Sequence, residues 1–224
     1  MPELKKISSA EAKQLVKDGP GPKKREAKAL DKKVTKAAKK PKLDSDGEEV
    51  KEAKKNTKEV NPDIKAMLAS VYEPEKHDPT GWYMSEKLDG VRCIWDGENL
   101  WSRNGLKFFP PSYFKAALPK DFHLDGELWT KRDDFQKCVS IVKRQDENDE
   151  WKGITYMIFD APGMGKTPFN QRFAKLQEVI GKIKSPYLTL LEHKICTSRE
   201  ELVKQMDVVT ADGGEGMMIR DPQS

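Results

Sequence analysis

A lysine placed two residues before an Asp-Gly pair is the first point at which this sequence could support covalent chemistry. The stretch EKLDGVR, from Glu86 to Arg92, contains Lys87 and the pair Asp89-Gly90. A phosphoramidate forms only from an unprotonated amine, whereas a free lysine has a pKa near ~10.4, so such a site must lower that pKa by partial burial or a nearby cation. Asp-Gly occurs six times in the chain and mostly marks turns, so these letters alone carry little weight.

Further segments follow this lysine in a fixed order. They are SRNG at 102–105, LDGELW at 124–129, YMIFD at 156–160 and GGEGMMIR at 213–220. With EKLDGVR they resemble motifs I, Ia, III, IIIa and IV of the covalent nucleotidyltransferase superfamily, which comprises DNA ligases, RNA ligases and messenger-RNA capping enzymes. Residues 78–222 are most similar to the minimal ATP-dependent DNA ligases of bacteria. The resemblance implies a ligase core that acts in DNA replication, recombination or repair.

The resemblance also implies roles for single residues. Lys87 would attack the α-phosphorus of ATP, release pyrophosphate and carry AMP, which then passes to a 5′-phosphate at a nick in double-stranded DNA. Leu88, Arg92, Glu127 and Phe159 would surround the nucleotide with it. Arg92 would offer ribose or phosphate a forked guanidinium that a lysine cannot reproduce. Phe159 would stack on adenine, with ordinary core packing as the alternative, and both interpretations predict a buried ring.

Two carboxylates are expected at the same site. Glu127 would lie on a strand after a second Asp-Gly turn, anchored by Leu124 and Leu128, and would bind the ribose hydroxyls or a divalent cation. The glycines around Glu215 permit close backbone approach, and a carboxylate there suits Mg²⁺ or Mn²⁺. These two glutamates and a triphosphate would form a hard-cation site, although a surface glutamate at a strand end is the alternative for Glu127.

Three other positions are weighed individually. Arg103, on the turn after the third strand, would contact the nick phosphate or be an ordinary exposed arginine. Arg172 heads a predicted helix and is interpreted as structural or ion-paired. Ser85 stands two residues before Lys87, where many larger ligases carry a glutamate that helps to recognise adenine, so ATP specificity rests on similarity to the minimal ligases.

Related ligases continue after motif IV into a Lys-x-Lys motif V and an OB-fold domain, whereas this sequence stops at Ser224. The sequence is therefore expected to be a fragment, a truncated product or a degenerate copy, with an adenylation domain that is incomplete at its C-terminus. Nick sealing by this chain alone is expected to be weak.

Apolar periodicity predicts an α+β domain of antiparallel sheets with flanking helices. Strands are expected at 82–86, 91–95, 99–102, 122–129, 154–160, 187–195 and 216–220. The first three would form a meander with tight turns at Asp89-Gly90 and Asp96-Gly97. Helices are expected at 62–72 after an Asn61 N-cap, at 133–144, at 169–183 and at 198–209, the last with Ser198 and Glu201 spaced as a capping box.

Charge and aromatic residues divide the chain near residue 60. Residues 1–60 hold 18 Lys+Arg against 11 Asp+Glu and no aromatic side chain, and the other 164 residues hold 23 against 26. So polar a segment cannot bury enough apolar surface to offset its chain entropy, so residues 1–60 are expected to be a disordered leader. Residues 61–224 have the size of one domain.

Lysine clusters at 20–33 and 36–44 suggest nuclear import or a nucleic-acid tether, with a solvated linker as the alternative. The three cysteines stand far apart, which indicates a reducing compartment. No stretch approaches the roughly 20 apolar residues of a membrane span. A soluble monomer is expected. His77, His123 and His193 show no spacing for metal or acid-base work and are expected at the surface or its boundary.

Two other functions remain open. One keeps the chemistry and changes the substrate, to RNA ends or to GTP-dependent capping. The other is a non-catalytic protein in which a basic tail and an incomplete domain bind nucleic acid electrostatically.

Overall fold

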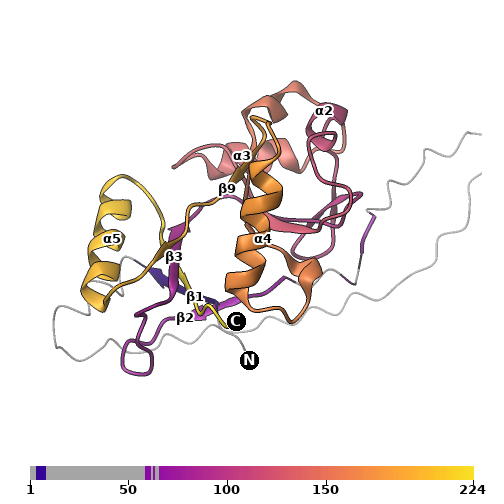
Figure 1. The fold of residues 1–224 in the computed structure, drawn as a ribbon. Coiled ribbons are helices and arrows are strands. Elements are labelled where there is room, and N and C mark those ends of the chain that lie inside the picture. Colours follow the sequence, from indigo (N-terminus) through magenta and orange to yellow (C-terminus); the bar gives the residue numbers. More distant parts are fainter. Residues whose placement is uncertain (1–3, 9–58, 62, 64–65) are drawn as a thin grey trace, which may run out of the picture. The chain divides into compact units, whose positions relative to one another are not determined.

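Short strands rich in buried residues form two β-sheets in the computed structural model (Figure 1). The structure describes residues 4–8, 59–61, 63 and 66–224, and of residues 4–8 only the backbone. These residues all belong to one compact unit. No helix among them is long and apolar enough to cross a membrane.

The smaller sheet has five strands, and two of them, β3 and β11, are antiparallel neighbours that carry candidate functional residues. In spatial order the strands are β10 (Lys194–Ile195), β3 (Tyr83–Lys87), β11 (Gly216–Arg220), β1 (Leu4–Ser8) and β2 (Ala69–Val71). The register of β3 and β11 sets Lys87 opposite Gly216. Helix α5 (Arg199–Ala211) packs on β11, with Met84, Leu202, Met206 and Ile219 in a small apolar cluster.

The larger sheet has six strands and the larger core. Its order is β6 (Lys107–Phe108), β5 (Leu100–Ser102), β4 (Val91–Trp95), β7 (Leu124–Trp129), β8 (Thr155–Asp160) and β9 (Leu188–Leu190). Helix α3 (Phe135–Val142) packs on β4 and β7, and α4 (Phe169–Gly181) packs on β8 and β9. Helix α2 (Ser112–Lys115) and 3-10 helices at Asp149–Gly153 and Pro162–Met164 lie in the connections.

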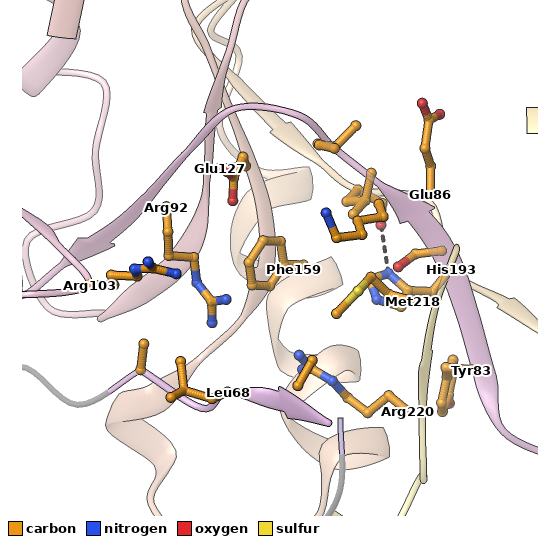
Figure 2. Close-up of a pocket in the computed structure, with 16 residues that line it drawn as sticks. Leu68, Tyr83, Glu86, Arg92, Arg103, Glu127, Phe159, His193, Met218 and Arg220 are labelled. Carbon is orange, nitrogen blue, oxygen red and sulfur yellow. Dashed lines mark hydrogen bonds between the residues drawn. The ribbon is translucent and has the colours of Figure 1, made fainter. Parts of the chain in front are cut away.

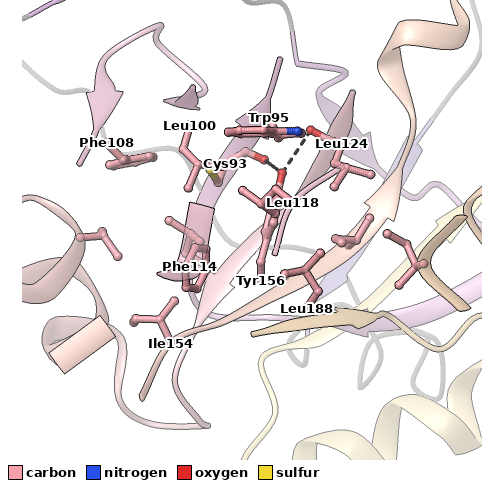
Figure 3. Close-up of a cluster of buried hydrophobic side chains, with 14 of the residues drawn as sticks. Cys93, Trp95, Leu100, Phe108, Phe114, Leu118, Leu124, Ile154, Tyr156 and Leu188 are labelled. Atoms are coloured by element: carbon pink, nitrogen blue, oxygen red, sulfur yellow. Dashed lines mark hydrogen bonds between the residues drawn. The ribbon is translucent and has the colours of Figure 1, made fainter. Parts of the chain in front are cut away.

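The core of the larger sheet is organised around Tyr156 (Figure 3). Its fully buried hydroxyl lies 2.9 Å from the carbonyl oxygen of Cys93 and 3.1 Å from that of Leu124. A buried phenol without such a partner would lose the hydrogen bonds that water offers it, so these carbonyls fix the ring between β4, β7 and β8. The strands that carry functional residues therefore rest on a well-packed base.

Several predicted elements are confirmed, with end shifts of a few residues. Strands 91–95 and 216–220 have the predicted bounds, and α3, α4 and α5 lie inside or within two residues of the predicted helices. The Ser198 hydroxyl caps α5 by accepting a hydrogen bond from the Glu201 N–H at 3.2 Å. The Glu201 carboxylate accepts from the N–H of Thr197 at 2.7 Å, so the predicted capping box is displaced by one residue.

The predicted three-strand meander is wrong at its first turn. Strand β3 belongs to the smaller sheet and β4 to the larger one, so Asp89-Gly90 carries the chain from one sheet to the other. A Cβ at Gly90 would lie 2.5 Å from the carbonyl oxygen of Leu128, so only glycine allows this crossing to pass so close to β7. The turn at Asp96-Gly97 does join β4 and β5 as predicted.

The segment before β3 also differs from expectation. The predicted helix at 62–72 is wrong, because Ala69–Val71 is strand β2, and the Asn61 side chain accepts a hydrogen bond from the Asp63 N–H at 3.0 Å in a local turn. Within the leader, Leu4–Ser8 forms strand β1 between β11 and β2, so disorder is not correct for these five residues. Backbone pairing with both neighbours gives this polar segment its structure. Of the rest of the leader the structure describes only Glu59 and Val60, and these two are also ordered by pairing: Val60 bridges Leu106, and the Glu59 carboxylate accepts from Lys107 Nζ at 2.6 Å.

The predicted strand at 187–195 is divided between both sheets. β9 pairs with β8 in the larger sheet, and β10 pairs with β3 in the smaller one. The three residues between these strands, Leu191 to His193, therefore pass beside both sheets.

Candidate functional site

A cavity of about 410 Å³ lies where the end of β3 faces β4, β7 and β8 of the larger sheet (Figure 2). The two sheets contribute different side chains to its wall. The smaller sheet and its crossing supply Tyr83, Ser85, Glu86, Lys87, Leu88, Met218 and Arg220. The larger sheet and its turn supply Arg92, Arg103, Glu127 and Phe159. Five predicted nucleotide-binding residues and Arg103 thus line one cavity, although they are spread over 73 positions of sequence.

Lys87 is the last residue of β3, and its amine forms an ion pair with the Glu215 carboxylate. Sheet register explains the pair: Gly216, opposite Lys87, opens β11, so the preceding Glu215 lies next to the amine. The Lys87 side chain is 26% exposed and that of Glu215 is 43% exposed. The amine is thus at the cavity wall, half-buried, and next to a carboxylate that can receive a proton.

Arg92 is held in place before any ligand binds. Its Nε and Nη2 donate to the two carboxylate oxygens of Asp125 at 2.5 and 2.6 Å, and its guanidinium carbon lies 4.6 Å from the ring centre of Phe159. Asp125 is only 2% exposed, so the pair is protected from water. Such a forked contact fixes the plane of the guanidinium. Arg92 lines the same cavity as Lys87, and Asp125 is a partner that the sequence did not indicate.

Glu127 lies opposite Arg92 in the β4–β7 register and faces the cavity. Burial raises the pKa of Glu127 to about 8, against the opposing effect of the Arg92 charge. The carboxyl group is therefore largely protonated at neutral pH in the ligand-free chain. The predicted Asp-Gly turn before it is wrong, because Asp125 and Gly126 lie inside β7, where a Cβ at Gly126 would be 2.4 Å from the carbonyl oxygen of Met157.

Phe159 is half-buried and faces the cavity, so the expectation of a buried ring is wrong. Strand alternation gives the reason: its neighbours Ile158 and Asp160 point into the buried side of β8. Figure 2 shows the ring projecting from β8 beside Arg92, toward Met218. A half-exposed aromatic face in a cavity is suited to a flat ligand.

Arg103 lies on the turn after β5, as predicted, and is exposed. It lines the cavity and also an adjoining groove of about 640 Å³ that shares Arg92 and Glu127. Lys143 adds positive charge to that groove, and Lys107 lies there paired with Glu59. A phosphate-bearing strand would find cationic side chains along this path.

A model of the family described as "ATP dependent DNA ligase domain" matches residues 66–224. The chain belongs to this family. A DNA ligase of Haemophilus influenzae is 33% identical over 144 residues, which cover 64% of this chain and 53% of that protein. The ligase domain thus spans about half the length of this curated relative.

Solved structures agree with the fold of this ligase domain. A structure described as a Lig E DNA ligase is 30% identical, with a TM-score of 0.66 over 71% of this chain and 62% of that chain. A Chlorella virus DNA ligase-adenylate is 21% identical, with a TM-score of 0.60 over 72% of this chain and 60% of that chain. The second likeness supports the α+β arrangement of the two sheets alone.

Arg172 of the ligase domain is ion-paired, which was one of the two predicted alternatives, and it is also buried. Its Nε donates to Asp160 at 2.8 Å, and Arg220 Nη1 donates to the other oxygen of Asp160 at 2.7 Å. Burial alone would raise the pKa of Asp160, but Arg220 and Arg172 hold it below its ordinary value. This cluster fixes α4 and β11 to the end of β8, next to the cavity.

His193 and Met218 line the cavity of the ligase domain, and sequence reasoning assigned neither of them a role. The Nδ1 of His193 lies 2.9 Å from the Leu191 carbonyl oxygen, which can only accept, so Nδ1 carries the proton. Burial lowers the pKa of His193 to about 4, so the ring is neutral at physiological pH. Its place between β9 and β10 depends on the division of one predicted strand between two sheets, for which the sequence carries no signal.

Within the described part of the chain, no group of three or more His, Cys, Asp or Glu side chains is placed to hold a metal ion. Glu127 lies in β7 and lines the cavity, whereas Glu215 directly precedes β11 and does not line it. The charge of Glu215 is nevertheless near enough to raise the pKa of Glu127. Mg²⁺ commonly binds through one or two carboxylates together with substrate phosphates. A two-carboxylate site of this kind is compatible with the ligase domain.

Proposed function

We propose that this chain is the adenylation core of an ATP-dependent DNA ligase, with Lys87 as the residue that carries AMP. One observation supports this most: the Lys87 amine lies at the wall of the cavity that Arg92, Glu127 and Phe159 line from the opposite sheet. An amine, a forked cation, a carboxyl group and an aromatic face are the groups that a nucleoside triphosphate requires for binding and attack.

In the proposed reaction the Lys87 nitrogen forms a bond to the α-phosphorus of ATP. The bond between the α-phosphorus and its bridging oxygen breaks, and pyrophosphate leaves with the electron pair. The ammonium group loses two protons on the way to the phosphoramidate: the Glu215 carboxylate, which is ion-paired with Lys87, is placed to accept the first, and pyrophosphate or water takes the second. The AMP is then transferred to a 5′-phosphate at a nick, and the 3′-hydroxyl displaces it.

Each half of the nucleotide has a suitable partner. The adenine would stack on Phe159, whose face is open to the cavity, and Arg92, oriented by Asp125, would bind ribose or phosphate. Leu88 lines the same wall as Lys87. The proposal includes the choice of nucleotide, which is ATP and not GTP.

Mg²⁺ or Mn²⁺ would be held by Glu127 and Glu215 together with phosphate oxygens, and would neutralise charge on the triphosphate. The raised pKa of Glu127 fits this role, because a buried carboxyl group gains most from a cation that compensates its charge. Glu127 is thus expected to release a proton when metal and nucleotide bind.

Nicked double-stranded DNA is the proposed partner of a monomeric ligase domain. The groove beside the cavity contains Arg103, Lys107 and Lys143, and Arg103 would contact the phosphate at the nick. Cationic side chains at the mouth of the adenylation cavity support a phosphate-bearing substrate.

Incubation with α-labelled ATP and Mg²⁺, followed by denaturing electrophoresis, tests this function. Label is expected on wild-type protein with ATP, and none on Lys87→Ala. A second step supplies a nicked DNA duplex, a nicked RNA duplex or no nucleic acid to the labelled protein, and release of label by the DNA arm is expected. Label from GTP but not ATP would assign capping chemistry, and no label with either would leave only a nucleic-acid-binding role.

Nuclear import through the lysine clusters at 20–33 and 36–44 is a separate part of the proposal. Both clusters lie outside the described residues, so composition is its whole support. A fluorescent fusion in which these lysines are replaced by glutamine should lose nuclear accumulation. Equal distribution of the wild-type and substituted fusions would contradict import.

A further inference from the structure

Arg132, which does not line the cavity, contacts two acidic residues that are distant from it in sequence: Glu86 of the cavity wall, and Asp212. Its Nε and Nη2 donate to the two carboxylate oxygens of Glu86, both at 2.9 Å. Its Nη1 donates to the Asp212 carbonyl oxygen at 3.2 Å and also contacts the Asp212 carboxylate. All three donor nitrogens of the guanidinium are therefore engaged.

These contacts join the two segments that carry the reacting pair. Glu86 directly precedes Lys87 in β3, and Asp212 stands three residues before Glu215 in the turn between α5 and β11. Arg132 itself follows the end of β7, which belongs to the larger sheet. One guanidinium thus links β7 to both segments that must meet for Lys87 and Glu215 to pair.

The turn is packed closely against this contact. A Cβ at Gly214 would lie 2.4 Å from Cγ1 of Val209 and 3.0 Å from the Glu86 carboxylate, so the turn rests directly on Glu86. Asp133, next to Arg132, has φ 57°, a left-handed conformation that is uncommon for a residue other than glycine. Such backbone strain persists where neighbouring contacts hold it.

Between these segments lies a smaller hollow of about 180 Å³, whose wall includes Lys87, Glu215 and Arg132. Loss of the contact would leave space into which the turn could move. The guanidinium is suited to its position because it presents donors in a rigid plane, whereas a lysine presents one flexible point charge. The positive charge of a lysine alone therefore does not replace Arg132.

We propose that Arg132 is a positioning residue, which holds Glu86 and Asp212 so that the Lys87 amine and the Glu215 carboxylate stay paired. It touches neither the amine nor the nucleotide cavity. The consequence for AMP transfer to Lys87 rests on the proposed function, whereas the consequence for the pair itself does not.

Arg144 offers a matched control. It forms the same type of contact, with Nε and Nη2 on Asp146 at 3.0 and 2.7 Å and Nη1 on Glu150 at 3.0 Å. Arg144, Asp146 and Glu150 line neither of the two hollows that Lys87 lines, nor the groove that contains Arg103. Arg144→Gln removes an equivalent surface contact without changing the surroundings of Lys87.

The first measurement needs no ATP. Lys87 is labelled with a trace of acetic anhydride at several pH values in the full chain, and each lysine is quantified by mass spectrometry. An amine released from its ion pair is more open to the reagent, and a partly exposed pair contributes up to about 1 kcal/mol, so Arg132→Gln is expected to raise labelling of Lys87 about 2- to 5-fold, with other lysines unchanged. Arg132→Lys should resemble Arg132→Gln, and Arg144→Gln should resemble wild type. Unchanged labelling of Lys87 in both Arg132 variants would overturn the proposal.

The second measurement is single-turnover transfer of AMP to the protein as ATP concentration varies. Because small displacements of reacting groups cost large factors in rate, Arg132→Gln should lower the maximal rate about 10- to 100-fold, with half-saturation changed less than about threefold. Asp212→Asn should lower it less, and the double variant Arg132→Gln/Asp212→Asn should match Arg132→Gln alone. A loss that equals the loss in Arg144→Gln, or that appears only in half-saturation, would contradict positioning. Absence of AMP on wild-type protein, with Lys87 labelling still altered in Arg132→Gln, would overturn the adenylation function and leave the positioning contact.

Discussion

The two sheets around the cavity differ in how they present their functional side chains. Arg92, Glu127 and Phe159 project from within strands β4, β7 and β8, which rest on the larger apolar core. Lys87 and Glu215 lie at the end of β3 and just before β11, on the sheet with the smaller core. The groups that would bind the nucleotide are thus fixed by the core of the larger sheet, whereas the reacting pair depends on local contacts.

This difference suggests that the two sheets have different roles. Side chains on paired, well-packed strands are pre-organised, so they can bind a ligand with little reordering. Groups at strand ends keep more freedom and need their own support, which Glu86, Asp212 and Arg132 supply here. Substitutions on the two sheets should therefore affect different quantities: binding on the larger sheet, and rate on the smaller one.

The largest effect is expected at Lys87. Lys87→Ala removes the only nitrogen proposed to bond to phosphorus, so protein-bound AMP should fall by at least about 10³-fold, to background. Binding of ATP, measured by calorimetry or fluorescence, should change by less than about fivefold, because Arg92 and Phe159 remain in place. Loss of ATP binding in this variant would show that the two sheets do not divide binding and reaction.

Adjacent residues of β8 give a paired test of binding against folding. Phe159→Ala should weaken ATP binding about 10- to 100-fold, because aromatic stacking on a base contributes about 1–3 kcal/mol. Ile158→Ala, at a fully buried position, should cost about 2–4 kcal/mol of unfolding free energy and leave the affinity of the folded fraction nearly unchanged. Thermal denaturation and ATP titration of both variants separate these outcomes. Equal effects of both substitutions on the affinity for ATP would contradict the proposal that Phe159 stacks on the adenine base.

The raised pKa of Glu127 predicts a pH dependence of stability. The folded chain binds a proton there up to about pH 8, whereas the unfolded carboxyl group loses it near its ordinary value of 4.5. The folded state therefore loses stability as pH rises through this window. Each pKa unit corresponds to about 1.4 kcal/mol, which partial solvent contact reduces to a total of about 2–3 kcal/mol.

Glu127→Gln removes this titration without a large change of shape. Urea denaturation at pH 5 and pH 8 should show wild type losing about 2–3 kcal/mol more than the variant across this window. Addition of Mg²⁺ and ATP should reduce the difference, because a cation stabilises the ionised carboxylate. Parallel stability curves for wild type and variant would contradict the raised pKa.

His193 predicts a smaller effect of opposite sign. Burial lowers its pKa to about 4, so the unfolded chain binds the proton first as pH falls from about 6.5. Its contribution to stability is present above that value and is lost as pH falls through 4, by about 1–2 kcal/mol. His193→Gln should reduce this loss of unfolding free energy at low pH, as measured by urea denaturation at pH 4, 5 and 7. If the variant loses as much unfolding free energy as wild type between pH 7 and pH 4, the ring is accessible to protons in the folded state.

Much of this molecule follows from the sequence. Short apolar runs bounded by turn residues predict β4, β7, β8 and β11. An ion-paired Arg172 was one of two alternatives, and the order of motifs identified Lys87, Arg92, Glu127 and Phe159 as one set. These inferences depend on local pattern or on family likeness, both of which are present in the chain itself.

Pairing between distant segments had to come from the tertiary structure. Asp89-Gly90 is an ordinary turn in sequence, yet it carries the chain between two sheets, because Gly90 lies close to the backbone of Leu128. Arg132 contacts Glu86, which is 46 residues away in sequence, and Asp212, which is 80 residues away. No local sequence pattern predicts these contacts. The sequence by itself determined which side chains could react. Only sheet register and packing decided that Lys87 meets Glu215, since the position of each depends on strands formed far apart in the chain.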